Sequence, residues 1–493
     1  MKKFLGVLLC TYFLNGTWCT RLLLRLLVID MPMKVSVSVE TLRRLDIKTR
    51  NEYHKSPDSK LKNVSLIEEF KSLEQFGAKG DGKTDDTQAI IKALNSPVPV
   101  VYAQKSKSYY KVSDKIVVSN INKKKLIATG AVFLNSDLTK ATFFFQRCNN
   151  IKIYGGKYGY VNTPNTNGNG SQHVFQFDDC QDVLLNNIHV KNSPEMGIAI
   201  TNSNRVTVKN SRIEHTFRDG TYSHYSANVN YLYNTYSNIK DDAMSFHDYG
   251  LDEQKKPLLK YGYKQATNLL AQGNIVKNCY QGFGSIGSSN VSVLNNKFTN
   301  TVIAAISIFN AQEMYPGGNA SAKKCLIQNN VITNACTTAS INEMSYSNYG
   351  QASTGRAAIC ILSLGARNQL NQGETKRLST IKVIGNTING SGANGFFANL
   401  VDNLHITNNK FMNCSGAVPQ QSLNGDVVEV WNCTALWANA NTVIDTRKNV
   451  LHQHGYAFNN VSGRMSGWNV KGVLRGESML DRTQSLQIIH NRK

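Results

Sequence analysis

The sequence has little of what marks the common helical folds. Proline occurs 9 times in 493 residues, and one stretch alone has the pattern of an amphipathic helix. Because only this one stretch has a helical pattern, a helical bundle is not expected. The 36 glycines, and the asparagines that repeatedly stand beside short runs of valine, isoleucine and leucine, are typical of short strands joined by tight turns. We therefore predict an all-β fold.

Motifs for metal binding and redox chemistry are also missing. None of the ten cysteines forms a Cys-x-x-Cys pair, and no histidine stands at a spacing suited to zinc. Several cysteines flank strand-like runs, as expected of small apolar side chains stacked inside a core. We expect no metal site and no required cofactor.

Negative charge is in short supply. The 33 acidic residues face 55 lysines and arginines, which gives a formal net charge of +22 and a pI near 9.5. The folded surface should therefore attract polyanions. The basic residues are spread along the whole chain without a nucleic-acid-binding motif, which argues against nucleic acid. An acidic polysaccharide is the favoured partner.

Long hydrophobic runs are confined to the N-terminus. Met1-Lys2-Lys3 precedes an apolar run over residues 4–14, which is the pattern of a secretory signal peptide, but a small-x-small cleavage site is missing after it. We interpret residues 1–30 as a signal peptide or an upstream extension. No later segment is apolar enough to span a membrane. The protein is expected to be secreted or, alternatively, to belong to a virion tail.

The rest of the chain divides into four segments. Residues 31–64 are polar and charged and are interpreted as a linker or attachment segment. Residues 65–115 form a predicted N-terminal cap with one short helix, residues 116–420 form the repetitive body, and residues 421–493 contain final coils and a C-terminal cap or tail. The helix has one apolar stripe, made of Ala89, Ile90, Ala93 and Leu94.

A loose repeat runs through the body of the chain. Its unit is an alternating apolar run that ends in asparagine, as in Val183 to Ile188 and Val206 to Asn210, and neighbouring units are about 23 residues apart. This step is the length of one coil of a parallel β-helix, in which stacking buries the apolar faces of the coils. A β-sandwich lacks such a step, and a propeller needs a period of about 40 residues.

A glycine-rich segment precedes the predicted helix and reads Phe76-Gly77-Ala78-Lys79-Gly80-Asp81-Gly82-Lys83-Thr84-Asp85-Asp86-Thr87, followed by the helix to Leu94. This segment resembles the opening signature of the pectate lyase superfamily. The superfamily includes polygalacturonases and bacteriophage tailspike depolymerases. The resemblance implies a right-handed parallel β-helix with an N-terminal cap helix and a glycan groove along one face. A tailspike would also be a homotrimer.

Aspartates form the strongest chemical constellation. Asp219 and the pair Asp241-Asp242 are separated by about one coil, so we expect Asp219 and Asp241 on adjacent coils. Carboxylates that close do not all ionise normally, and one pKa should rise. Glycoside hydrolysis needs such a division into an acid and a base. The alternative is that these aspartates occupy turns, where aspartate is common.

Strand alternation predicts which side chains reach the solvent. If Met244 and Phe246 point into the core, then Asp241, Ala243, Ser245 and His247 point outward. Asp242 has inward parity and would need a turn at the start of the strand to escape burial. We therefore predict His247 as a fourth catalytic residue beside the aspartates.

The aspartates also resemble those of the polygalacturonase family of glycoside hydrolases. By that resemblance Asp241 is the general acid, and Asp219 and Asp242 hold the attacking water. The sequence departs from the family at Phe283, which stands where the family has a histidine, and it lacks the downstream Arg-Ile-Lys.

Further side chains are predicted to hold the substrate. They are His224, Tyr222, Arg218 and Lys240, with Glu214 and His215 in reserve as acid or base. Two alternatives to a hydrolase stay open. A polysaccharide lyase would eliminate across a uronic acid and would need Ca²⁺ or arginine to neutralise the carboxylate. A non-catalytic adhesin or receptor-binding spike would use the same groove only to hold sugar.

Overall fold

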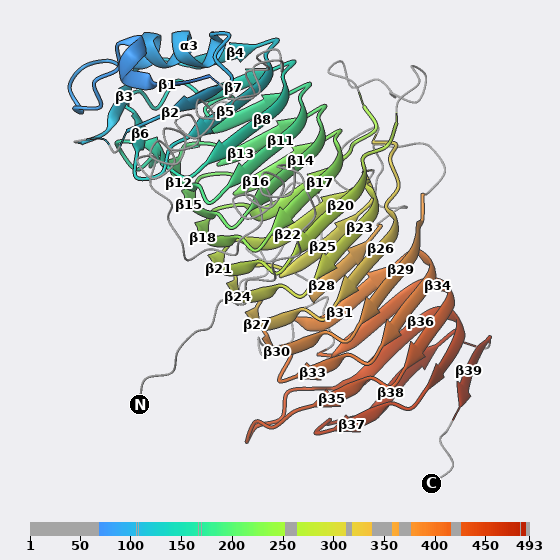
Figure 1. Ribbon diagram of the computed structural model, residues 1–493. Coiled ribbons are helices and arrows are strands. Elements are labelled where there is room, and N and C mark those ends of the chain that lie inside the picture. Colours follow the sequence, from blue (N-terminus) through green and yellow to red (C-terminus); the bar gives the residue numbers. More distant parts are fainter. Residues whose placement is uncertain are drawn as a thin grey trace, which may run out of the picture. The chain divides into compact units, whose positions relative to one another are not determined.

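The computed structural model describes residues 69–489, with gaps at 105, 107, 166, 169, 252–263, 312–317, 338–356, 364–375, 416–424 and 484. The predicted segments 1–30 and 31–64 lie outside the described residues. The described residues form a right-handed parallel β-helix with one short α-helix near its start (Figure 1). None of the described helices has the length and hydrophobicity that a membrane-spanning helix requires.

The cap at the N-terminal end begins with the 3-10 helix η1 (Leu73–Phe76), which is followed by the predicted helix, α3 (Thr87–Asn95). Ile90, Ala93 and Leu94 are buried, and Ala89 packs against the same core, so the predicted apolar stripe is confirmed. The carboxylate of Asp86 accepts hydrogen bonds from the backbone N–H groups of Lys79 (2.6 Å) and Gly80 (3.1 Å), which ties the glycine-rich turn to the helix start.

Three strips of parallel strands build the coils, and we call them the first, second and third faces. The first face consists of β4 (Ile116–Ser119), β7 (Phe143–Gln146), β10 (Phe175–Asp178), β13 (Ile198–Thr201), β16 (Thr221–His224), β19 (Asp242–His247), β22 (Gln281–Ile286), β25 (Ile306–Phe309), β28 (Ala357–Leu362) and β31 (Asn394–Asn399). The second face consists of β1 (Phe70–Ser72), β2 (Val100–Tyr102), β5 (Asn122–Ile127), β8 (Asn149–Tyr154), β11 (Gln181–Asn186), β14 (Asn204–Lys209), β17 (Ala227–Leu232), β20 (Thr267–Gln272), β23 (Ser289–Leu294), β26 (Lys323–Gln328), β29 (Leu378–Ile384) and β32 (Val401–Thr407).

The third face is a separate sheet. It consists of β3 (Tyr110–Val112), β6 (Val132–Asn135), β9 (Lys157–Tyr160), β12 (His189–Ser193), β15 (Arg212–Thr216), β18 (Thr235–Ile239), β21 (Ile275–Cys279), β24 (Lys297–Thr301), β27 (Val331–Ala335), β30 (Thr387–Ser391), β33 (Lys410–Met412), β35 (Thr442–Ile444) and β37 (Asn469–Lys471). The long strands β34 (Val428–Asn439) and β36 (His454–Ser466) pass through the first and second faces, and β38 (Gly476–Asp481) and β39 (Leu486–Ile489) pair with the two halves of β36. Coiling therefore starts before residue 116 and continues past residue 420.

The predicted repeat is confirmed in the strand register. Val183 pairs with Val206, and Val383 pairs with Ile406, so residues one repeat apart are neighbours on successive coils. Alternate residues of each strand fill the interior, where aromatic rings also stack, with 5.0 Å between the ring centroids of Phe145 and Phe177. All eight described cysteines are unbridged and buried, as expected of small core side chains.

Asparagine pairs explain how the chain turns between coils. In Asn295-Asn296 the first residue adopts a left-handed backbone conformation (φ 55°), which asparagine tolerates better than most residues. The second side chain is buried and joins a ladder that runs along the stack. The buried ladder contains Asn234, Asn274, Asn296, Asn330, Asn386, Asn409 and Asn441.

Each rung of the ladder satisfies the polar groups of the next. The Oδ1 atom of Asn296 accepts hydrogen bonds from the backbone N–H (2.8 Å) and Nδ2 (2.9 Å) of Asn274. Its own Nδ2 donates to the carbonyl of Ala271 (2.9 Å) and to Oδ1 of Asn330 (3.0 Å). Because no water reaches these groups, the ladder holds only when neighbouring coils are in register.

Replacing Asn296 with alanine should lower the free energy of unfolding by about 3 kcal/mol, because several buried groups of Asn274, Ala271 and Asn330 lose their partners. The matched control is Asn300→Ala, which removes exposed hydrogen bonds with Asn278 and Asn334 and a left-handed asparagine. It should cost about 1 kcal/mol. Urea unfolding followed by circular dichroism measures both, and equal losses would contradict the role given to the buried ladder.

Candidate functional site

The aspartates meet on the first face, with a register one residue away from the predicted one. Thr221 pairs with Met244, and the N–H of Gly220 donates to the carbonyl of Asp242 (2.9 Å). Asp219 therefore stands beside Asp242 on the next coil, whereas Arg218 stands beside Asp241. The predicted neighbours were Asp219 and Asp241, so the coil spacing was correct and the partner was shifted by one residue.

A break in strand alternation brings Asp242 to the outer side of the sheet. Met244 and Phe246 lie in the core as predicted, but Ala243 also belongs to the core, so its predicted outward position is wrong. Ala243 lies at a corner beside Gly220, where the next coil passes so closely that a side chain on that glycine would meet the carbonyl of Ala243. Asp242, at the start of β19, therefore shares the outer side with His247, with 3.6 Å between its Oδ2 and the histidine Nε2.

Two of the carboxyl groups are almost fully buried. Asp219 is 2 % exposed and Asp242 is 6 % exposed. Burial raises the pKa of both well above the ordinary aspartate value, and the charge of Asp241 raises both further. The hydroxyl of Ser245 donates to Oδ2 of Asp219, while Oδ1 of Asp242 finds no hydrogen-bond partner among the described residues.

Asp241 differs from this pair because it is ion-paired at the surface. Its Oδ2 lies 2.9 Å from Nε of Arg218, and its side chain retains 21 % exposure. Lys240, the neighbouring residue, is exposed, and its ammonium lies over the ring of Phe217 at 4.0 Å from the centroid. Arg218 therefore joins the carboxyl cluster, whereas Lys240 is held beside it by Phe217.

Aromatic rings border the cluster on its outer side. Tyr222 lies edge-on to His247, with 5.1 Å between the ring centroids, and His224 pairs with His247 on the next coil. Burial lowers the pKa of His247, and burial together with His247 lowers the pKa of His224 to about 3. Both imidazoles are therefore neutral at physiological pH. Tyr249 hydrogen-bonds Nδ1 of His247 (3.2 Å), which orients the ring.

The reserve residues lie elsewhere. Glu214 is on the third face, where it accepts a hydrogen bond from Arg212 (2.6 Å) and contacts His189 (2.6 Å). His215 is exposed and has a left-handed backbone (φ 55°). Neither residue reaches the first face, so the sequence proximity to Asp219 did not translate into a shared site.

Sequence reasoning missed Gly284, and it placed Ser245 on the outer side without giving it a role. Gly284 pairs with Ser245, and a side chain at this position would collide with the carboxylate of Asp242, because an added Cβ would lie 2.2 Å from Oδ2. The preceding residue, Phe283, is fully buried in the core. Phe283, which stands where the polygalacturonase family has a histidine, is therefore a core residue here, and Gly284 beside it leaves room for the side chain of Asp242.

One oxygen each of Asp219 and Asp242 and one ring nitrogen of His247 lie within 4.8 Å of one another. Such a set of oxygen and nitrogen atoms could hold a divalent cation. The pair of carboxyls can equally share a proton, since their raised pKa values favour the neutral form.

No protein-family model matches the sequence, and a comparison with curated proteins finds no significant match. Among solved structures, the chain is similar to tailspike protein 3 of bacteriophage CBA120 (TM-score 0.57, 13% identity), over 92% of this chain and 69% of that one. It is also similar to the N-terminal fragment of gene product 12 of bacteriophage Phi29 (TM-score 0.54, 16% identity), over 90% of this chain and 75% of that one. At these identities the likeness shows the shared fold.

Asp219→Asn and Asp242→Asn should each stabilise the folded protein at neutral pH. The folded-state pKa of both carboxyls is raised, so their contribution to stability is fully present below the ordinary pKa of the unfolded chain and is lost as the pH rises through the raised value. Asparagine keeps the neutral form at every pH. The melting temperature, measured at pH 5 and pH 8, should show a larger gain at pH 8.

The matched control is Asp182→Asn, which removes an exposed aspartate paired with Arg205 (2.6 Å). It should not stabilise the protein at either pH, because the pKa of Asp182 is lowered by its hydrogen bond with Arg205. Destabilisation by Asp242→Asn at pH 8 would mean that the folded protein holds Asp242 as an ion.

Proposed function

We propose that this protein is a glycoside hydrolase that cuts an acidic extracellular polysaccharide. The observation that carries the proposal is the cluster on the first face, where two buried carboxyls with raised pKa values adjoin a third carboxylate that is paired with Arg218. An acid and a base made from the same residue type are what hydrolysis of a glycosidic bond requires.

The local charges suggest which carboxyl carries the proton. Burial and the negative charge of Asp241 favour the protonated form of both Asp219 and Asp242. Asp242 donates to the leaving glycosidic oxygen in this proposal, because its Oδ1 has no partner among the described residues, whereas Asp219 is bound by Ser245. Asp241, the most exposed of the three, acts as the base or nucleophile, and Asp219, which accepts a hydrogen bond from Ser245, lies beside Asp242 on the neighbouring coil. This division gives the acid role to Asp242, whereas the family resemblance implies Asp241.

The acidity of the substrate is inferred from the positive groups around the cluster. The guanidinium of Arg218 retains 42 % exposure and faces the reacting carboxyls, so it can also pair with the carboxylate of a uronic acid. Tyr222 and His247 border the same place and can hold the sugar ring. The net charge of +22 favours approach of a polyanion from solution.

A polysaccharide lyase is the second candidate, because His247 supplies a neutral imidazole that can accept the proton removed in elimination. We prefer hydrolysis because it needs a protonated carboxyl beside a second carboxylate, and the cluster supplies both. The products distinguish the two reactions, since elimination leaves an unsaturated sugar that absorbs ultraviolet light. Retention of polysaccharide without any cleavage would instead indicate an adhesin or receptor-binding spike.

The setting of the activity is also a proposal. The fold shared with tailspike protein 3 of bacteriophage CBA120 supports an extracellular role, either in a virion tail or as a secreted enzyme. A tail protein is expected to be a homotrimer, which a mass measurement of the native protein would show.

Asp242→Asn and Asp241→Asn should each reduce cleavage by about a hundredfold or more, because each removes one partner of the acid and base pair. Release of reducing ends from acidic polysaccharides measures the rate. Asp182→Asn removes an exposed, ion-paired aspartate of the second face and should cut at the parental rate. Parental activity in Asp242→Asn would dispose of the assigned acid.

The cleavage rate should fall as the pH rises through the raised pKa of Asp242, because the proton donor is then lost. The measurement is kcat/KM as a function of pH on one polymer. Ser245→Ala removes the hydroxyl donated to Asp219 and should leave this alkaline limb in place with a reduced rate. A rate that keeps rising with pH would favour elimination by a histidine base.

A further inference from the structure

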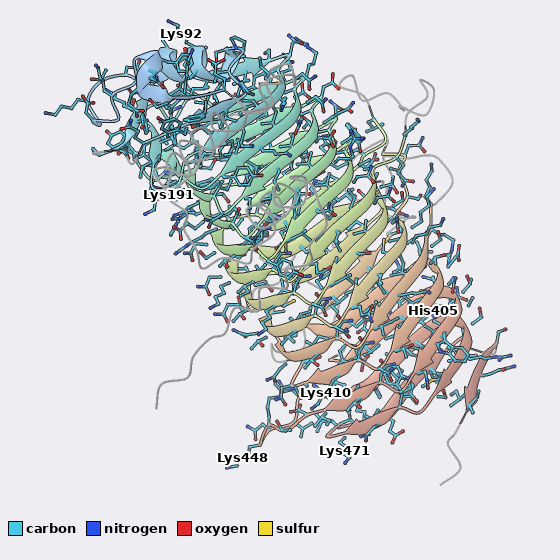
Figure 2. The ribbon with its side chains drawn as sticks, viewed as in Figure 1. Lys92, Lys191, His405, Lys410, Lys448 and Lys471 are labelled. Atoms are coloured by element: carbon cyan, nitrogen blue, oxygen red, sulfur yellow. The ribbon has the colours of Figure 1, made fainter. Side chains whose placement is uncertain are left out.

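A second surface with binding character lies on the second face, far along the stack from the aspartates. Five side chains occupy one register position on successive strands, and we call them the Trp437 row: Lys382, His405, Trp437, Arg464 and Gln487. His405 is labelled on these C-terminal coils in Figure 2, and β16 and β34 lie well apart in Figure 1.

Trp437 is the unusual member of the row. Its side chain is 41 % exposed, whereas the other described tryptophans pack against aromatic rings, Trp431 on Phe397 (5.1 Å) and Trp468 on Tyr456 (4.9 Å). A single exposed apolar side chain is common on protein surfaces and needs no explanation by itself. The residues beside Trp437 are what indicate a binding surface.

Positive charge flanks the tryptophan without local neutralisation. Lys382 and Arg464 are exposed, and neither lies within ion-pair distance of a described carboxylate. The nearby acid, Asp402, is already taken by Arg377 (2.7 Å) and Thr434 (2.6 Å). The two cations are therefore available to an anion from solution.

Polar side chains form a parallel row two residues further along the same strands. Thr407, Asn439 and Ser466 occupy one register position there and are half-buried. Ser466 donates to Oδ1 of Asn439 (2.7 Å), which leaves the amide nitrogen of Asn439 as a donor. Hydroxyl and amide groups beside an aromatic ring suit the hydroxyls of a sugar, while the ring packs on its C–H face.

The spacing of the row fits a chain of sugars. Neighbouring coils are about 4.8 Å apart, which is close to the length of one sugar unit in an extended polysaccharide. Successive units can therefore meet successive coils. Single-stranded nucleic acid is the competing anion, but it is bound by stacking successive bases on several aromatic rings, and this row has one.

We propose that the Trp437 row is a second, non-catalytic binding site for an acidic polysaccharide, with the sugar ring on Trp437 and carboxylates on Lys382 and Arg464. The identity of the ligand rests on the proposed function, whereas binding at this row does not require cleavage. The row has no carboxyl pair and holds the polymer while the first face cuts it.

Binding is tested in protein that carries Asp242→Asn, so that the polymer stays intact, with polygalacturonate and its neutral methyl ester as probes. Adding Trp437→Ala should weaken binding of both polymers by about tenfold or more. Adding Lys382→Gln and Arg464→Gln together should weaken binding of polygalacturonate and leave the methyl ester unchanged. The control is Tyr233→Ala, which removes another exposed aromatic side chain (56 %) and should bind as the parent does.

The proposal is overturned if Trp437→Ala binds like its parent, if neither polymer binds, or if single-stranded DNA binds through Trp437 and the polysaccharides do not. The proposed function fails separately. The protein with intact aspartates could bind polygalacturonate through Trp437 and never cut it. That result would support the binding site at the Trp437 row and reject the proposed hydrolase activity. If the protein cuts the polymer but Trp437→Ala binds it normally, the hydrolase proposal survives and the binding site at the Trp437 row is rejected.

Discussion

The rest of the structure depends on the in-register stacking of coils. A coil alone cannot bury its apolar face, so its stability comes from the coils above and below it. Parallel pairing would tolerate a slip if only apolar contacts held it, but a slip in the buried asparagine ladder leaves amide groups without partners on both sides. The ladder therefore converts a general preference for stacking into one defined alignment. That alignment determines which outward-facing residues lie next to one another.

The carboxyl cluster uses this rigidity at a cost in stability. Asp219 and Asp242 stand side by side because their coils are aligned, and little water reaches them to solvate a charge. Two buried acids next to Asp241 are unfavourable for folding at neutral pH, and the surrounding ladder and core offset that cost. Raised pKa values often mark functional sites, since a group kept neutral at physiological pH can act as an acid. Under the proposed function, the same burial that weakens the fold keeps Asp242 protonated, so that it can act as the acid.

The sequence was sufficient for the fold because period and turn chemistry repeat many times along the chain. The repeat from Val183 to Val206 can be read directly from the sequence. In pairs such as Asn295-Asn296 the first asparagine forms the turn and the second joins the ladder. The site was harder to predict because it depends on single residues. Alternation placed Ala243 outward and Asp242 inward, and the corner beside Gly220 reversed both. Coil length also varies, so Asp242 pairs with Gln281, much more than one repeat away, and no periodic pattern could show that Gly284 makes room for its carboxylate.

A repeating scaffold suits a repeating ligand. Side chains on one register position recur at each coil, so a line of them can meet a polymer at regular intervals without any loop being shaped for it. The two surfaces place different groups on that geometry, a carboxyl cluster with Arg218 on the first face and cations on the second. On the first face the pKa values of Asp219 and Asp242 are raised and Asp241 is paired with Arg218, which under the proposed function lets an anionic sugar approach them. On the second face Lys382 and Arg464 remain unpaired with described acids, which attracts the same anion directly. An excess of basic residues is then consistent with both surfaces, since a polyanion must be drawn to the protein before its acidic groups can act on it.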